Sequence, residues 1–276
     1  MNWSVTPKSL LLNALPVAAA VLVWWAATTY ILVQPRIYPT PQGVFTELVR
    51  IFKNEGPIGE PYTHAAATLW RLTIAWGGGF VAATLLGVLA GRKKWVFDFF
   101  SYPVWIAMAV PSVVWVYIFL VVFGIEEMVP ILALMILLAA PVFLGTAEGV
   151  RSTPKELLEM CDSYKIGTRQ RLFHFYLPYI APYMVANARV SFAYGIRIVL
   201  IAEVIGLPNG VGILVGYWSD SLYMAPIVAW GLLLMATGMI VDYCIFAPLQ
   251  RRIRREAEPR PASKRQPSGN SRLKRA

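Results

Sequence analysis

Five ionisable side chains lie inside long apolar runs of this sequence, where the chemistry open to them is charge pairing or anion binding. They are Arg71, Arg189, Arg197, Glu203 and Asp242. If the runs cross a membrane, each charge costs about 2.5–3.5 kcal/mol on insertion scales and should face a partner or water. Interhelical ion pairs that hold a helical bundle together are one interpretation. The alternatives are that Arg197 or Arg71 presents its charge to an anionic substrate, or that Arg71 snorkels to the interface.

No catalytic constellation accompanies these charges. The sequence has no GxxxxGK[ST] phosphate loop, so we do not expect the chain to bind or hydrolyse ATP. It has no HExxH or GxSxG motif, and its only histidines are His64 and His174. Cys161 and Cys244 belong to no CxxC pair or Cys/His cluster, so we expect neither a metal site nor a disulfide. We therefore expect no catalytic residues and no cofactor bound by this chain.

The composition indicates which elements must position the five charges. The chain has 276 residues, is 57% hydrophobic and only 14% charged, whereas a soluble domain has about 25% charged residues. These values predict an all-α, polytopic membrane protein, because a spanning helix needs about 20 mostly apolar residues. We expect one transmembrane domain over residues 1–250 with six spans, at roughly 10–33, 68–90, 102–123, 129–147, 180–206 and 226–249.

The distribution of lysine and arginine predicts the orientation of these spans. Nineteen of the 25 basic residues fall at the N-terminus, in the loops after the second and fourth spans, and in the last 26 positions. All four segments lie on one side, which the positive-inside rule assigns to the cytoplasm, so both termini should be cytoplasmic. Arg189 and Asp242 then lie in the inner half of the membrane, and Arg71, Arg197 and Glu203 nearer the outer half. Residues 251–276 read as a disordered basic tail that faces membrane lipids rather than nucleic acid.

Two outer segments carry local structure of their own. Thr40-Pro41 predicts a helix start, and Val44, Phe45, Leu48, Val49 and Phe52 would share one face of that helix. The helix would lie on the outer leaflet, or the segment would instead be a loop packed on the bundle. Residues 207–225 are apolar and lack lysine and arginine, which indicates a segment folded back against the mouth of the bundle.

The largest polar insert lies between the fourth and fifth spans, at residues 153–178. Thr153, Pro154 and Glu156 predict a capping box at the start of a helix over 154–165, and Gly167 is a plausible stop. Leu157, Leu158, Cys161 and Tyr164 would form its apolar face. Such a helix either lies on the membrane surface or docks into a groove of a partner protein.

The spacing of this insert resembles the EAA loop of ABC-importer permeases, in which Glu-Ala-Ala, three residues, Gly and nine residues precede Ile-x-Leu-Pro. Here Glu159-Met160-Cys161 occupies the first block, Lys165 takes the place of the glycine, and Phe175-Tyr176-Leu177-Pro178 closes the pattern. Further segments are similar to the sulfonate, taurine, nitrate, bicarbonate and thiamine-precursor branch of that family. They are Tyr38-Pro39-Thr40-Pro41, Thr68-Leu69-Trp70-Arg71, Gly87 to Arg92, Tyr102 to Ile125, and Ala202 to Gly212.

The resemblance implies a type I ABC-importer permease, and with it a set of partners. Helix 154–165 would be the coupling helix on a cytoplasmic ATPase subunit, through Glu156, Leu157, Glu159, Met160, Cys161, Tyr164, Lys165, Gly167 and Pro178. A second permease copy would complete the path, two ATPase subunits would bind ATP and Mg²⁺, and a solute-binding protein would deliver the substrate. The bacterial inner membrane is the implied location. An ion-gradient-driven transporter, with Asp242 or Glu203 in its path, is the rival hypothesis.

Overall fold

The computed structural model describes residues 7–32 and 34–257, and these two ranges contain helices, turns and loops but no strand. The first half of the chain forms α1 (Pro7–Ala26, extended by a π-helical turn Ala27–Ile31), α2 (Pro41–Phe52), α3 (Pro61–Arg92), α4 (Lys94–Ala109), α5 (Ser112–Phe123) and α6 (Met128–Arg151). The second half forms α7 (Lys155–Ser163), α8 (Thr168–Arg171, followed by a π-helical turn Leu172–Tyr176), α9 (Leu177–Gly206), α10 (Val211–Asp220), α11 (Met224–Val241, followed by a π-helical turn Asp242–Phe246) and α12 (Ala247–Ala257).

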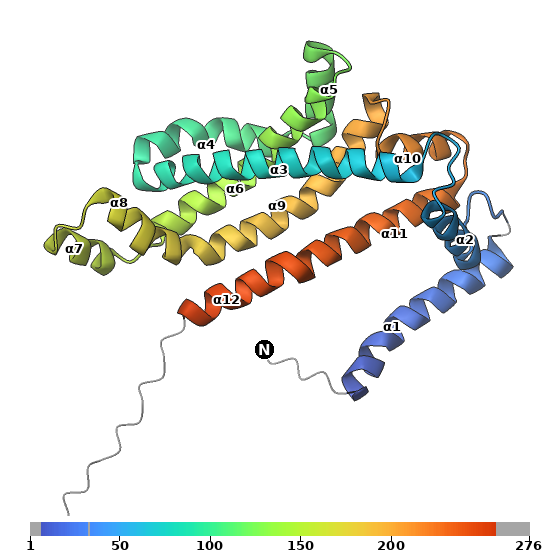
Figure 1. Ribbon diagram of the computed structural model, residues 1–276, viewed down its shortest axis with the longest axis horizontal. Coiled ribbons are helices and arrows are strands. Elements are labelled where there is room, and N and C mark those ends of the chain that lie inside the picture. The colour runs from blue at the N-terminus through green and yellow to red at the C-terminus, as the bar shows by residue number, and fades with distance from the viewer. Residues whose placement is uncertain (1–6, 33, 258–276) are drawn as a thin grey trace, which may run out of the picture.

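The long helices α3, α6, α9 and α11 run along the long axis of the molecule and form its bundle (Figure 1). Short helices lie at the two ends: α7 and α8 at one end, α2 and α10 at the other. Glycine brings α3 and α6 close together, because a Cβ at Gly79, Gly87 or Gly91 would come within 2.8–2.9 Å of a backbone oxygen of α6. Small residues allow such close helix contact in membranes.

Several of the expected spans are confirmed as helices long and apolar enough to cross a membrane. Within the described ranges three single helices meet this condition, namely Pro61–Arg92, Met128–Arg151 and Met224–Ile253. The bent pair formed by Thr168–Gly206 and Val211–Asp220 contains the expected fifth span. The first expected span, 10–33, corresponds to α1 and its π-helical turn, whose apolar stretch is Leu15–Ile31.

The expected span over 102–123 is not one continuous helix. Two helices replace it, α4 and α5, which meet at an angle of 102° (Figure 1). The cause is local: Val110 precedes Pro111, and steric contact with the proline ring disfavours helical geometry at that position. Val110 is accordingly extended, with φ −79° and ψ 131°, and α5 begins only after Pro111.

Both outer segments form helices that pack on the bundle. Thr40 caps α2 as expected, since its Oγ1 accepts a hydrogen bond from the Gly43 amide at 3.2 Å. The buried face of α2 differs from the expected one, because Val44 and Ile51 pack against α10 and α11 whereas Phe45 and Phe52 remain exposed. In segment 207–225, α10 is bent by 59° relative to α9 and packs against the bundle through the buried Val211, Gly212 and Leu214.

The basic tail expected over 251–276 begins as helix, because α12 continues to Ala257. The remainder of that segment lies outside the described residues. The bundle thus separates two places of interest by its full length: the α7–α8 end, and the end where α3, α9 and α10 meet.

Candidate functional site

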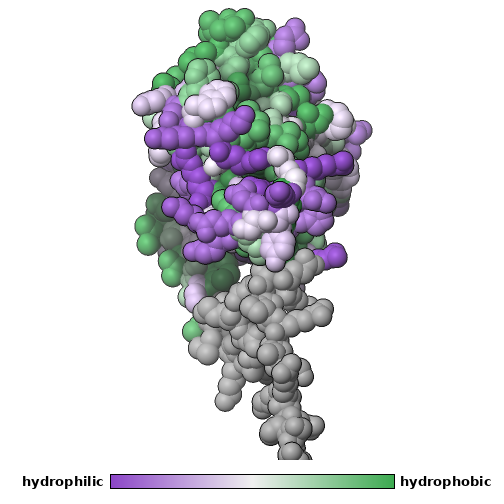
Figure 2. Space-filling model, turned by 90° about the vertical axis from the view of Figure 1, so that its left-hand side faces the viewer, coloured by the Kyte–Doolittle hydropathy of each residue, from purple (hydrophilic) through white to green (hydrophobic). Residues whose placement is uncertain are grey.

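The α7–α8 end presents a polar surface. Viewed along the bundle from this end, hydrophilic side chains form a broad band across the middle of the molecule, with apolar side chains above it and to one side (Figure 2). The start of α7 differs from the expected capping box. Pro154 occupies the N-cap position, no side chain caps the helix, and the Thr153 Oγ1 is buried without a hydrogen-bond partner. Thr153 therefore lies one residue too early to cap, and the helix starts at Lys155.

The end of α7 is built around Lys165. This residue has φ +50°, a left-handed conformation that costs a non-glycine residue roughly 1–2 kcal/mol. Its amide donates to the Asp162 carbonyl at 3.0 Å, and the Ile166 amide donates to the Cys161 carbonyl at 2.9 Å. These two bonds form a Schellman motif, in which glycine usually takes the position of Lys165. The expectation that Gly167 ends the helix is wrong, since Gly167 has φ −62° and precedes α8.

Helix α7 has an inner and an outer face. On the inner face Cys161 is fully buried, and Leu158 packs against the cluster that contains Val150 and Ile180. On the outer face the side chain of Tyr164 is 78% exposed and that of Met160 43% exposed. The single apolar face expected for Leu157, Leu158, Cys161 and Tyr164 is thus divided, because Tyr164 points outward. Glu156, Glu159 and Lys165 are exposed and Leu157 is half-buried.

The segment that follows α7 ties it to the long helices. Asp162 pairs with Arg171 of α8, and this hydrogen bond raises the pKa of the Arg171 guanidinium above its usual value. Tyr179 in the first turn of α9 donates its hydroxyl to the Ser152 carbonyl at the end of α6, at 3.0 Å. Pro178 follows the π-helical turn Leu172–Tyr176, through which the helix continues from α8 into α9. Helix α7 is thus joined to α8 by an ion pair, and to α6 and α9 by the packing of Leu158.

At the opposite end, a buried ion pair joins α3 to α9. Arg71 donates from Nη1 to Glu203 Oε1 at 2.9 Å, and both side chains are almost completely buried. The Thr68 hydroxyl donates to the same carboxylate, at 2.8 and 2.9 Å to its two oxygens, and the Gly212 amide donates to Glu203 Oε2 at 2.9 Å. Arg71 also donates to the Asn209 carbonyl at 3.0 Å and contacts the partly exposed Glu127 at 3.3 Å. Every donor around Glu203 therefore stabilises its carboxylate.

The loop before α10 is fitted around this pair. Gly210 has φ +116°, and a Cβ there would lie 2.3 Å from the carboxyl carbon of Glu203. The Gly210 amide donates to His64 Nδ1 at 3.1 Å, while His64 Nε2 lies 2.7 Å from the Ile58 carbonyl. A neutral histidine with its proton on Nε2 satisfies both contacts. The polar cluster, comprising Arg71, Glu203, Thr68, His64, Asn209 and the amides of Gly210 and Gly212, thus fixes the start of α10 against α3 and α9.

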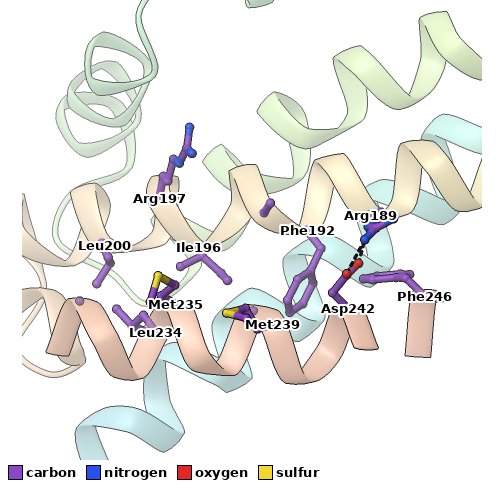
Figure 3. Close-up of a pocket in the computed structure, with 13 residues that line it drawn as sticks. Arg189, Phe192, Ile196, Arg197, Leu200, Leu234, Met235, Met239, Asp242 and Phe246 are labelled. Carbon is purple, nitrogen blue, oxygen red and sulfur yellow. Dashed lines mark hydrogen bonds and ion pairs between the residues drawn. The ribbon is translucent and has the colours of Figure 1, made fainter. Parts of the chain in front are cut away.

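The five intramembrane charges fall into three groups. Arg71 pairs with Glu203, as described, and Arg189 of α9 pairs with Asp242 at the end of α11 (Figure 3). Arg197 is the exception, because the described residues give it no hydrogen bond and no ion pair; its guanidinium lies 5.8 Å from the centre of the Tyr194 ring.

Four further residues of the polar cluster and its surroundings were not expected from the sequence: Thr68, His64, Asn209 and Glu127. Thr68 is one helical turn from Arg71, and this spacing was the signal available for it.

Comparison with known proteins assigns the chain to a transport family. A family model described as binding-protein-dependent transport system inner membrane component matches residues 83–255. The taurine transport system permease protein TauC of Escherichia coli (strain K12) is 24% identical over 253 residues, which cover 91% of each protein. The putative aliphatic sulfonates transport permease protein SsuC of the same organism is 26% identical over 222 residues, covering 80% of this chain and 83% of that protein. The nitrate import permease protein NrtB of Synechocystis sp. (strain ATCC 27184 / PCC 6803 / Kazusa) is 22% identical over 178 residues, 64% of each.

Proposed function

Since the chain belongs to the family of binding-protein-dependent transport system inner membrane components, and is thus a multi-pass permease subunit of an ABC importer, we propose that α7 is its coupling helix. In this proposal the outer face of α7, with Glu156, Glu159, Met160 and Tyr164, seats in a groove of a cytoplasmic ATPase subunit. ATP and Mg²⁺ bind to that subunit and not to this chain. The observation that supports the proposal best is the exposure of an aromatic and a thioether side chain among carboxylates at the polar end of the molecule.

The contacts around α7 suit the transmission of force. The Asp162–Arg171 pair joins α7 to α8, the packing of Leu158 joins α7 to Val150 of α6 and Ile180 of α9, and the Tyr179–Ser152 bond joins α6 to α9. A displacement of α7 by the closing ATPase subunits would therefore move the bundle as a rigid unit. Rigid-body motion of this kind exposes a path alternately to the two sides of the membrane.

The α7–α8 end then faces the cytoplasm, as do both termini, and α2 and α10 face the outside. A solute-binding protein would deliver its load at the outer end, where the polar cluster holds α10 against α3 and α9. A second copy of the permease would complete the path, with a second ATPase subunit beneath it. The named relatives carry taurine, aliphatic sulfonates and nitrate, so we propose a small solute, anionic or heterocyclic, for this chain too.

The pairing of the acidic residues in the spans does not favour an ion-gradient mechanism. Such a mechanism needs an acidic group in the path that can release and take up a proton or bind a cation. Both acidic residues considered for that role already have cationic partners, Glu203 in Arg71 and Asp242 in Arg189. Uptake into cells that is abolished by ATP depletion but withstands an uncoupler distinguishes the ATP-driven importer from the gradient-driven one.

The proposed docking is tested by purifying the tagged permease from its native membranes and measuring Mg²⁺-dependent ATP hydrolysis in the isolate. Met160→Arg places a bulky charge on the outer face of α7 and should remove the ATPase activity from the isolate. Met128→Arg, on a 65% exposed side chain at the start of α6, is the matched control and should retain it. Equal hydrolysis in the two variants, at equal permease yield, would contradict the docking role of α7.

A further inference from the structure

Of the five charges expected inside the spans, Arg197 alone has no ionic partner among the described residues. Arg71 and Arg189 each form an ion pair with an acid on another helix. Among the described residues Arg197 forms no ion pair, and its guanidinium lies 5.8 Å from the centre of the Tyr194 ring, a cation–π contact that compensates its charge weakly. Its side chain points away from α11 and from the Arg189–Asp242 pair (Figure 3).

The position of Arg197 along α9 keeps it away from the ends of the span. It lies nine residues before Gly206, or about 14 Å at roughly 1.5 Å per residue, and farther still from the start of the helix. An uncompensated arginine at such depth costs about 2.5–3.5 kcal/mol on insertion scales, unless it reaches water or an anion. Within the single chain the residue is exposed, so no neighbouring helix covers its side chain.

Two cavities of the molecule share Arg197. The first has a volume of about 490 Å³ and lies between α9 and α11, where the side chains shown in Figure 3 enclose it. The second has about 400 Å³ and lies between α9, α6 and the bend that joins α4 to α5. Apart from the paired Arg189 and Asp242, the side chains that line both are predominantly apolar, among them Phe192, Met235 and Met239 in the first, and Met108, Leu137 and Ile201 in the second. A single positive charge thus stands between two apolar spaces, each large enough for a small organic molecule.

We propose that Arg197 binds the anionic group of the transported solute, a small organic sulfonate or carboxylate, while the apolar walls of the adjoining cavities accept its hydrocarbon part. This inference rests on the proposed transport function and deepens it. The planar guanidinium offers two parallel donors to a sulfonate or carboxylate, a geometry that an ammonium group does not provide. A solute that neutralises Arg197 removes the cost of the unpaired charge, and the solute leaves when the path opens to water.

The local potential around Arg197 is measurable with charged thiol reagents. In a parent with Cys244→Ser, and with the fully buried Cys161 retained, Met235→Cys places a reactive thiol in the first cavity. Modification rates are measured in nanodiscs containing the permease–ATPase complex, with the anionic reagent 2-sulfonatoethyl methanethiosulfonate and the cationic reagent 2-(trimethylammonium)ethyl methanethiosulfonate. Met128→Cys, at the exposed start of α6, is the remote control.

Arg197→Met should lower the ratio of anionic to cationic rates at position 235 by about tenfold, as expected for one unit charge acting across about 10 Å in a medium between protein and water. Arg197→Lys keeps the charge and should keep most of the ratio, and the ratio at position 128 should not change. Ethanesulfonate should slow modification at 235 in the parent, whereas the uncharged ethyl methyl sulfone should not. This protection should disappear in Arg197→Met.

An unchanged ratio in Arg197→Met would overturn the proposal, as would equal protection by the sulfonate and the sulfone. Pairing of Arg197 with a lipid phosphate or with an acid of the second copy would give those same negative results, since the charge would already be neutralised. ATP hydrolysis in the same nanodiscs separates this inference from the function on which it rests. If the nanodiscs hydrolyse ATP but modification at position 235 shows no effect of Arg197, only the role of Arg197 is refuted. If Arg197 does affect modification at position 235 but the nanodiscs do not hydrolyse ATP, the ATPase partnership is refuted.

Discussion

Replacing Glu203 by glutamine should destabilise the permease more than any other single-atom change in its spans. Glutamine keeps the shape of the side chain but turns one acceptor oxygen into an amide donor. All the neighbours of Glu203 are donors: Arg71, the Thr68 hydroxyl and the Gly212 amide. The substitution therefore sets a donor against a donor and removes the negative charge that faces a buried guanidinium.

The expected cost follows from the burial of the pair. Removing one partner of a buried ion pair costs about 3–5 kcal/mol, because the other charge remains desolvated. Arg71 keeps contacts with Asn209 and with the partly exposed Glu127, so the lower end of that range applies. For a domain of this size about 3 kcal/mol corresponds to roughly 6–12 °C in Tm. The matched control is Asp242→Asn, which breaks a pair that the chain buries far less completely, so the loss of stability should be smaller.

Unfolding of the detergent-solubilised permease, followed by the fluorescence of its ten tryptophans, measures both variants under the same conditions. We expect the Tm of Glu203→Gln to lie well below that of Asp242→Asn. If the two Tm values agree within about 2 °C, the buried cluster does not hold the outer end of the bundle, and the reasoning from burial to stability is wrong.

Three further predictions concern single positions. Lys165→Gly relieves the left-handed strain at the end of α7 and should raise the Tm of the permease by a gain of about 1 kcal/mol; a lower Tm would show that the Lys165 side chain itself stabilises the turn. Gly210→Ala should prevent stable folding, since its Cβ would overlap Glu203, whereas Gly77→Ala, with open space around it, should raise stability by about 0.5–1 kcal/mol; similar Tm values for the two would contradict the fit of the loop. Burial, together with the hydrogen bond to Glu47, raises the pKa of the Tyr223 phenol above 10. The stabilisation by the protonated Tyr223 phenol is complete below pH 10 and is lost as the pH rises from 10 toward the folded-state pKa. In Tyr223→Phe the Tm should therefore fall less steeply over this pH range.

Charge pairing within the spans was partly predictable from the sequence. Helix direction and depth placed Arg189 level with Asp242, but they placed both Arg71 and Arg197 near the depth of Glu203 and did not decide which of the two pairs with it. The contacts of Thr68 and His64 were not predictable in this way. Their partners are backbone amides of a loop that folds back beside α10, and the path of such a loop depends on tertiary packing around Gly210.

Local geometry explains the errors. The bend at Val110-Pro111 was predictable in principle, because a residue before proline avoids helical geometry. Proline is also tolerated inside membrane helices, however, so its presence alone did not predict a break in the span. At α7 the spacing located the helix correctly, whereas the caps depended on one residue at each end. Pro154, and not Thr153, occupies the N-cap position, and Lys165 has the left-handed conformation that glycine favours. Which side of α7 is buried depended on the contacts of α6 and α9.

The most direct test of the central claim is to record what lies against the outer face of α7 in the working complex. A photoreactive p-benzoylphenylalanine introduced in place of Tyr164, which is 78% exposed, is irradiated in membranes that hydrolyse ATP. Tyr102 of α4, which is 74% exposed, serves as the control position. If α7 is the coupling helix, position 164 forms a covalent adduct with the ATP-hydrolysing subunit and position 102 forms none. An adduct from position 164 with lipid or with the permease alone, in membranes where the complex is intact, would contradict the assignment of α7 as the coupling helix.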